Sequence, residues 1–275
     1  MRITINQIKN MKQKGEKIVM LTAYDYTTAQ MIDKAGIPLI LVGDSLGMVV
    51  LGYESTIPVT IEDMLHHTKA VVRGTKKTMI IGDMPFMTYH VSIDETLKNA
   101  ARFIQEGGAQ AIKLEGGVNV AEKVRRIVDC GIPVMGHIGL TPQSVYQLGG
   151  FKVQGKTTET AIRLLKDAQA LEEAGAWAVV LETVPAQLAT LITQKLSIPT
   201  IGIGAGVGCD GQVQVINDML GSYTDFVPKH AKQYTKLSNI MYNAISEYSN
   251  EVKNGSFPTD EHSFSMDENL LSEIG

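Results

Sequence analysis

Five apolar runs along the chain each end at an ionisable residue. The residues at these five ends are Asp44, Asp83, Glu115, His137 and Glu182. Side chains two positions apart in a strand point to the same face, so each end residue should share a face with the apolar residues two and four positions before it. In neighbouring parallel strands, these polar groups would meet at one end of a single sheet.

The alternation of apolar runs with amphipathic segments predicts an α/β fold. Strands are expected near residues 17, 38, 78, 110, 133, 177, 199 and 224. Several helices end in a small residue followed by Gly, a tight turn typical of chains with parallel strands. Eight strands without a visible linker favour a single (β/α)8 TIM barrel over an open doubly wound sheet, and a short amphipathic helix over residues 5–14 should cap one end.

The C-terminal part of the chain is expected to complete the barrel. A short helix is predicted over residues 212–220, and helical spacing of apolar residues over 236–252 predicts the final barrel helix. The chain then becomes polar. We therefore expect residues 1–264 to form a catalytic barrel domain and residues 265–275 to form a frayed polar tail.

Composition excludes several classes of protein. The chain of 275 residues has a net charge of −4 and scattered Lys and Arg, which argues against a nucleic-acid binder. No signal-like segment and no run of about 20 apolar residues is present, so we expect no membrane segment and a cytoplasmic location. Cys130 and Cys209 lack the CxxC spacing of a metal site and predict no disulfide framework.

Three of the strand-end residues are candidate metal ligands. Asp44, Asp83 and Glu115 carry hard oxygen donors, and magnesium is commonly held by one or two carboxylates that leave room for water and substrate. Active sites of barrels lie at this face, which favours a magnesium site. The alternative is that each carboxylate caps the following helix. That alternative explains Glu115 least well, because two glycines follow it.

The other polar strand residues are candidates for substrate binding and proton transfer. An inward Lys113 needs an anionic partner, which Glu115 or a bound substrate would provide. His137 is equally consistent with a residue of the active site and with a core histidine whose hydrogen bonds are satisfied. A carboxylate in an apolar pocket has a raised pKa, which suits Glu182 as a general acid or base, although a carboxylate at the start of a helix is an equal alternative.

Loops and glycines limit the chemistry further. Two long loops, over residues 45–60 and 138–157, follow strands and should form walls or lids of a pocket. The glycine-rich run over residues 202–208 has Val207 where the dinucleotide fingerprint needs its last glycine, so that motif is excluded. A phosphate cradle and close backbone packing both stay open there. The absence of a G-x-S-x-G elbow argues against a serine hydrolase.

The chain resembles the ketopantoate hydroxymethyltransferase family, also called 3-methyl-2-oxobutanoate hydroxymethyltransferases. The resemblance covers about residues 3–264 in unbroken order. It rests on Gly43-Asp44-Ser45-Leu46-Gly47, Ile57-Pro58-Val59-Thr60, Asp83-Met84-Pro85-Phe86-Met87, Lys113-Leu114-Glu115-Gly116-Gly117, His137-Ile138-Gly139-Leu140-Thr141-Pro142-Gln143, Leu181-Glu182-Thr183-Val184-Pro185 and Gly202-Ile203-Gly204-Ala205-Gly206.

The resemblance implies a (β/α)8 barrel assembled as a homodecamer and a one-carbon transfer in pantothenate and coenzyme A synthesis. A hydroxymethyl group would pass from the co-substrate 5,10-methylenetetrahydrofolate to 3-methyl-2-oxobutanoate, giving 2-dehydropantoate through a magnesium-stabilised enolate. One magnesium ion per subunit would be bound by the carboxylates of Asp44 and Asp83, with Glu115 beside it. The substrate would contact Asp44, Ser45, Asp83, Lys113 and His137, and Glu182 would be the catalytic proton-transfer residue.

Two departures from the family pattern are visible, at Asn217 and over residues 228–230. We expect both to affect subunit packing and not the site. Two alternatives differ in function class. One is a magnesium-dependent oxoacid lyase or mutase of the phosphoenolpyruvate mutase and isocitrate lyase group, which would need no folate. The other is a non-catalytic barrel that only binds oxoacids.

Overall fold

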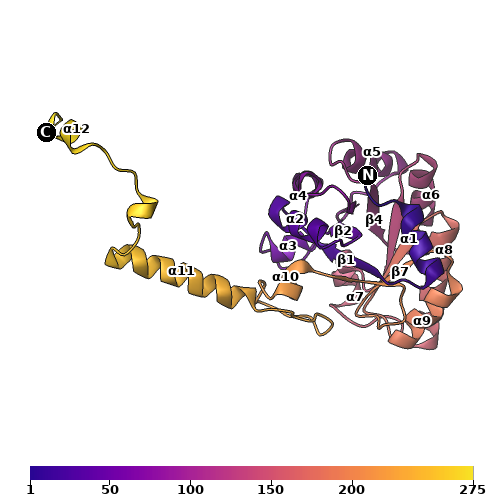
Figure 1. Ribbon diagram of the computed structural model, residues 1–275. Coiled ribbons are helices and arrows are strands. Elements are labelled where there is room, and N and C mark those ends of the chain that lie inside the picture. Colours follow the sequence, from indigo (N-terminus) through magenta and orange to yellow (C-terminus); the bar gives the residue numbers. More distant parts are fainter. Residues whose placement is uncertain (275) are drawn as a thin grey trace.

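Eight short parallel strands form a closed barrel in the computed structural model, which describes residues 1–274 (Figure 1). The strands are β1 (Ile18–Thr22), β2 (Leu39–Val42), β3 (Met79–Asp83), β4 (Ala111–Glu115), β5 (Val134–Gly139), β6 (Ala178–Glu182), β7 (Thr200–Ile203) and β8 (Gly211–Gln214). Each strand pairs with the next in sequence, and β8 pairs with β1. The predicted single (β/α)8 barrel is therefore confirmed.

Helices connect most of the strands and cover the outside of the barrel. The longer ones are α2 (Tyr26–Lys34), α4 (Ile61–Gly74), α5 (Ile93–Gln105), α6 (Ala121–Asp129), α8 (Thr158–Glu173) and α9 (Ala186–Lys195). The short ones are α3 (Leu46–Val49), η1 (Val118–Val120), η2 (Pro142–Ser144), α7 (Val145–Leu148) and α10 (Ile216–Leu220). Their starts follow local chemistry: at α4, the Asp63 N–H donates to Thr60 Oγ1 at 3.1 Å, a side-chain cap.

Strand residues alternate between the inside of the barrel and the layer beneath the helices. In β3, Met79 and Ile81 belong to the inner apolar cluster, whereas Ile80 belongs to the outer one. The N-terminal helix α1 (Ile5–Lys14) closes one end, because its fully buried Ile8 packs into the inner cluster. The predicted capping helix is confirmed, and the polar strand ends lie at the opposite end of the barrel.

The eighth strand is not where the sequence predicted it. The strand expected near residue 224 is wrong: β8 lies earlier, within the predicted helix 212–220, of which only α10 is helical. In β8 the outward positions are Gln212 and Gln214, so the strand lacks the apolar outer face that marks the other strands. Residues 204–210, all of them described, join β7 to β8 without a helix.

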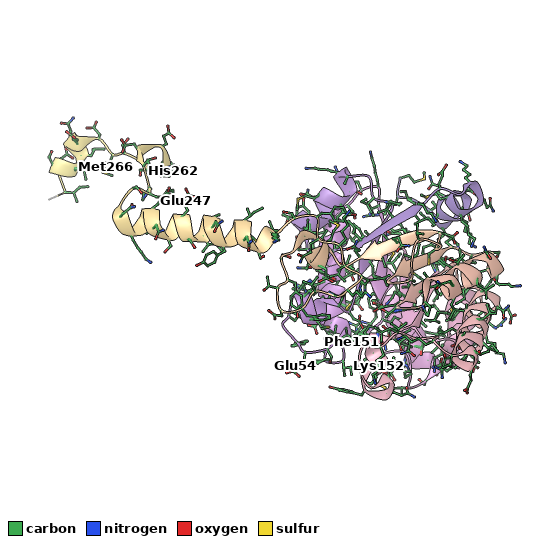
Figure 2. The ribbon with its side chains drawn as sticks, turned by 90° about the horizontal axis from the view of Figure 1, so that it is seen from below. Glu54, Phe151, Lys152, Glu247, His262 and Met266 are labelled. Atoms are coloured by element: carbon green, nitrogen blue, oxygen red, sulfur yellow. The ribbon has the colours of Figure 1, made fainter. Side chains whose placement is uncertain are left out.

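The last long helix forms but does not cover the barrel. Helix α11 (Leu237–Asn254) projects away from it, and none of its 18 residues, all of them described, is buried (Figures 1 and 2). The prediction that this segment packs as the final barrel helix is therefore wrong for the single chain. Beyond it lie η3 (Asp260–His262) and the exposed α12 (Glu268–Ser272), so the tail is partly helical; Gly275 lies outside the described residues.

The outward projection of α11 leaves one face of the barrel open. On the outer side of β1, Val19 is 44% exposed, although it is a strand residue of a barrel. An apolar groove of about 470 Å³ runs beside it between α2, β1, β8 and α10, and its lining includes Met31, Ile37 and Leu220. We call this groove the β8–β1 groove.

Across residues 1–274 no helix has both the length and the apolar character needed to cross a bilayer. The division of the chain at residue 264 stays a prediction.

Candidate active site

Four neighbouring strands bring most of the predicted site residues together at the barrel mouth. The residues are Asp83 on β3, Lys113 and Glu115 on β4, His137 on β5 and Glu182 on β6. In the sheet register, Asp83 is the partner of Lys113, and Glu115 is the partner of His137. The period-two prediction is confirmed for these strands, because the residues two positions before them belong to the inside of the barrel.

Lys113 and Asp83 form a buried ion pair. The Lys113 Nζ donates to both carboxylate oxygens of Asp83 at 2.7 Å, and the two residues are 3% and 1% exposed. Burial alone would lower the pKa of Lys113, but the nearby carboxylates of Asp83, Glu115 and Asp44 outweigh it and raise the pKa. Lys113 is therefore a fixed cation, and its predicted anionic partner is Asp83 more directly than Glu115.

Asp44 joins the site for a different reason from the one predicted. The residues two and four positions before it, Val42 and Ile40, belong to the outer cluster, so the strand alternation would point it outward. The chain instead turns after β2, and the Asp44 N–H donates to Asp83 Oδ2 at 3.4 Å. Burial, and then the charges of Asp83 and Glu115, raise the pKa of Asp44 well above its ordinary value.

His137 lies between two carboxylates. Its Nδ1 is 3.4 Å from Glu115 Oε1, and its Nε2 is 3.3 Å from Glu182 Oε2; the distances fit ion pairs, although the angles do not fit hydrogen bonds. Burial and Lys113 lower the pKa of His137, but Glu115 and Glu182 outweigh them and raise it to about 9. The structure therefore favours a site imidazolium over a core histidine.

Two residues of the site, Gln143 and Tyr89, were not assigned a role from the sequence. Gln143, in η2 of the loop after β5, donates from Nε2 to Asp44 Oδ2 at 2.9 Å and from its backbone N–H to Glu115 Oε2 at 3.1 Å. Its side-chain oxygen accepts from the Tyr89 hydroxyl at 2.6 Å. This long loop therefore reaches the site carboxylates, and its role as a wall or lid of a pocket stays a prediction. Gln143 closes the motif that begins at His137, but its spacing alone does not show that it points inward.

Ser45 directly follows Asp44 at the barrel mouth. Its Oγ is 2.8 Å from the Tyr24 hydroxyl, and the residue is half-buried at the start of α3. The loop over residues 45–60 continues from it, and Figure 2 shows Glu54 from that loop at the same end of the barrel as Phe151 and Lys152. Both long loops therefore surround the mouth.

Comparison with known proteins identifies the family. A family model described as ketopantoate hydroxymethyltransferase matches residues 2–260. The chain belongs to this family. It is 70% identical over 274 residues to a 3-methyl-2-oxobutanoate hydroxymethyltransferase of Dehalococcoides mccartyi, which covers 100% of this chain and 98% of the relative. A Chloroflexus aurantiacus protein of the same name is 62% identical, with coverage of 97% and 94%.

Solved structures support the fold of this ketopantoate hydroxymethyltransferase family member. A phosphoenolpyruvate phosphomutase from Streptomyces platensis has a TM-score of 0.63 at 13% identity and covers 99% of this chain and 94% of its own. Phosphonopyruvate hydrolase, solved with oxalate and Mg²⁺, has a TM-score of 0.62 at 12% identity, with coverage of 99% and 95%. At these identities the likeness concerns the barrel alone.

The carboxylates at the barrel mouth are candidate ligands for magnesium. Within residues 1–274 no three His, Cys, Asp or Glu side chains are arranged to hold a metal together. Magnesium needs only one or two protein carboxylates, and the adjacent Asp44 and Asp83 supply two. Their charge, together with that of Glu115, exceeds what Lys113 and His137 neutralise. The donor set fits a two-carboxylate site, with Glu115 occupied by its contacts to His137 and Gln143.

One departure from the family pattern lies nearer the site than the sequence indicated. Residues 228–230 were expected not to touch the site; His230 packs against Gly204, directly after β7, and the charge of Glu182 acts to raise the pKa of His230. Their closeness was not visible in the sequence, because His230 belongs to an irregular segment that follows a misassigned strand.

Proposed function

We propose that this family member transfers a hydroxymethyl group from 5,10-methylenetetrahydrofolate to 3-methyl-2-oxobutanoate and yields 2-dehydropantoate for pantothenate and coenzyme A synthesis in the cytoplasm. The activity is carried over from relatives that are 58–70% identical over nearly their whole length. One observation supports it most directly. The row of Lys113, His137 and Glu182 offers two cations to an oxoacid anion and a carboxylate to its C3 proton.

The carboxylates of Asp44 and Asp83 would hold one magnesium ion per subunit, with Glu115 beside it. When bound, the ion supplies Lewis-acid stabilisation of charge that develops on the substrate's keto oxygen. Lys113 orients Asp83 through its two hydrogen bonds. Gln143 orients Asp44 in the same way, so the two carboxylates are positioned before substrate arrives.

The remaining residues bind the oxoacid and move its proton. Lys113 and the His137 imidazolium place positive charge beside the substrate anion, and Ser45, next to Asp44, offers a hydroxyl. Glu182 takes the proton from C3, and the carbanion so formed attacks the methylene carbon supplied by the folate. Water then completes the release of the hydroxymethyl product. The buried walls around Glu115 and His137 limit access of other water to the carbanion.

The first test replaces Glu182 by Gln. We expect exchange of the C3 hydrogen of 3-methyl-2-oxobutanoate with D2O to fall by about 10² to 10⁴, because a positioned general base typically contributes that much. NMR follows the exchange without folate, and Glu159→Gln, at an exposed position on α8, is the matched control. Full exchange in Glu182→Gln would contradict the assignment.

A second measurement separates the function classes. Formation of 2-dehydropantoate should require the oxoacid, the folate and added magnesium together. Consumption of the oxoacid without folate would favour the lyase or mutase alternative. Binding of the oxoacid without turnover would favour the non-catalytic barrel.

We also propose that the chain forms a homo-oligomer, a decamer by family resemblance, in which α11 of one copy covers the β8–β1 groove of another. Helix α11 follows β8 and α10 in the chain, so it is the helix that should cover this face. Its exposed apolar stripe includes Ile240, Met241 and Ile245. Exchange of the helix between copies would cover both apolar surfaces at once.

A further inference from the structure

A histidine that the proposed mechanism does not use, His230, packs at the end of β7, the strand that neighbours Glu182. Glu182 is the most open member of the cluster, with a side chain 17% exposed against 2% for His137. Its register partner on β7 is Ile203, whose carbonyl accepts from the Thr183 N–H at 2.8 Å. Gly204 follows directly. A Cβ on Gly204 would lie 3.2 Å from the Nδ1 of His230, so the imidazole rests on this glycine beside the Glu182 position.

The segment that carries His230 is held against the barrel by residues that follow His230. The backbone N–H of Lys232 donates to Gln214 Oε1 on β8 at 3.2 Å, and that of Tyr234 donates to the carbonyl of Met219 on α10 at 2.8 Å. A turn that includes His230 is closed by the Ala231 N–H, which donates to the Pro228 carbonyl at 2.9 Å. His230 is therefore positioned by β8 and α10, although its own segment is neither helix nor strand.

Two histidines therefore lie near Glu182: His137 contacts its carboxylate, and His230 packs on Gly204, one residue beyond the register partner Ile203. His137 has a raised pKa and is an imidazolium near neutral pH. The pKa of His230 is lowered by burial, which outweighs the opposing effect of Glu182. Within the described residues Glu182 is the charged group that acts on His230, and Lys229 and Lys232 of the same segment are exposed. A neutral imidazole accepts a proton, whereas an imidazolium does not.

We propose that His230 is a positioning residue through which Glu182 exchanges its proton with solvent. The inference rests on the proposed role of Glu182 as the base. In the step, the proton that Glu182 has taken from C3 passes through water to the free ring nitrogen of neutral His230. The imidazolium releases a proton to solvent from its other nitrogen, and Glu182 is a carboxylate again. Only a proton moves, so no oxidant or co-reactant is needed.

His230→Phe tests the proposal in the full-length chain, because a phenyl ring retains the planar packing on Gly204 and cannot carry a proton. Deuterium entry at C3 of 3-methyl-2-oxobutanoate is measured in D2O with magnesium and without folate. We expect the exchange rate to fall about tenfold with KM unchanged, since relaying is one part of the general-base contribution. Added imidazole should restore the rate of the variant and leave the wild-type rate unchanged.

The controls separate a relay from packing. His66→Phe, at an exposed position on α4, should leave both exchange and imidazole dependence unchanged. His230→Gln should slow exchange and respond to imidazole as His230→Phe does. A wild-type rate in either His230 variant, or a loss that imidazole does not restore, would overturn the proposal. Full exchange in Glu182→Gln, measured in parallel, would instead show that the proposed base is wrong.

Discussion

The two halves of the barrel differ in how far residues of the same chain contact and cover them. From β3 to β6, the inward polar residues have their partners within the same chain, as Lys113 and Asp83 do at 2.7 Å. The outer sides of these strands are covered by helices. Around β8 and β1 the outer face is open, Val19 is exposed, and the helix next in sequence projects into solvent (Figure 1).

The difference separates chemistry from assembly. The carboxylates, cations and Gln143 at the mouth contact one another inside a single copy, so the site needs no neighbouring copy to bring these residues together. The apolar surfaces of the β8–β1 groove and of α11 face water in the single chain, which costs free energy that association would recover. We therefore expect substitutions in the first region to affect folding and catalysis, and those in the second to affect assembly first.

The largest expected effect lies in the first region. Lys113→Met leaves Asp83 as a buried carboxylate without its cation, which should lower the free energy of unfolding by about 3–5 kcal/mol. Urea unfolding followed by circular dichroism measures it. The double variant Lys113→Met with Asp83→Leu should recover much of the loss, because a buried pair replaced by apolar residues is often neutral. A double variant no more stable than the single one would contradict this explanation.

A smaller effect is expected in the second region. Met241→Asp places a charge on the apolar stripe of α11 and should raise the dissociation constant of the oligomer at least about tenfold, because burial of an unpaired carboxylate costs more than ~1.4 kcal/mol. Ser246→Asp, on the opposite side of the helix, is the control. Analytical ultracentrifugation compares the two. Equal assembly of both variants would show that the stripe is not an interface.

Much of the first region could be predicted from the sequence. A period of two places Asp83, Glu115 and Glu182 inside the barrel, since regular strands carry the alternation to their last residue. Asp44 reaches the same site only through the turn after β2, which no period describes. Gln143 was missed for the same reason, because the direction of a loop side chain depends on tertiary contacts.

The second region was harder to predict because its partner lies outside the chain. Gln212 and Gln214 face an uncovered side of the barrel, so β8 lacked the apolar pattern of a barrel strand and was interpreted as part of a helix. Helix α11 was predicted correctly as a helix. Its stripe has the same spacing whether it packs on its own barrel or on another copy, and periodicity does not distinguish the two.

The smallest expected effect concerns Asp218, a buried carboxylate of α10 in the second region. Burial raises its pKa to about 6 in the folded chain, whereas an unfolded aspartate titrates near pH ~3.9. The raised folded pKa contributes stability below pH ~4 that is lost as the pH rises through 6. Asp218→Asn, which stays neutral, should therefore gain stability relative to the wild type as the pH rises from 5 to 7.5, by about 1 kcal/mol.

Urea unfolding of the wild type and of Asp218→Asn at both pH values measures this difference. Asp260→Asn, in the exposed η3, is the control and should shift neither curve. If the gain in the free energy of unfolding of Asp218→Asn is the same at pH 5 and 7.5, the Asp218 carboxylate is not shielded from water. Water would then reach the second region beneath α10 as well as its surface. Helix α11 of another copy would have to cover a hydrated face, and the burial of apolar surface would be a weaker argument for exchange of the helix between copies.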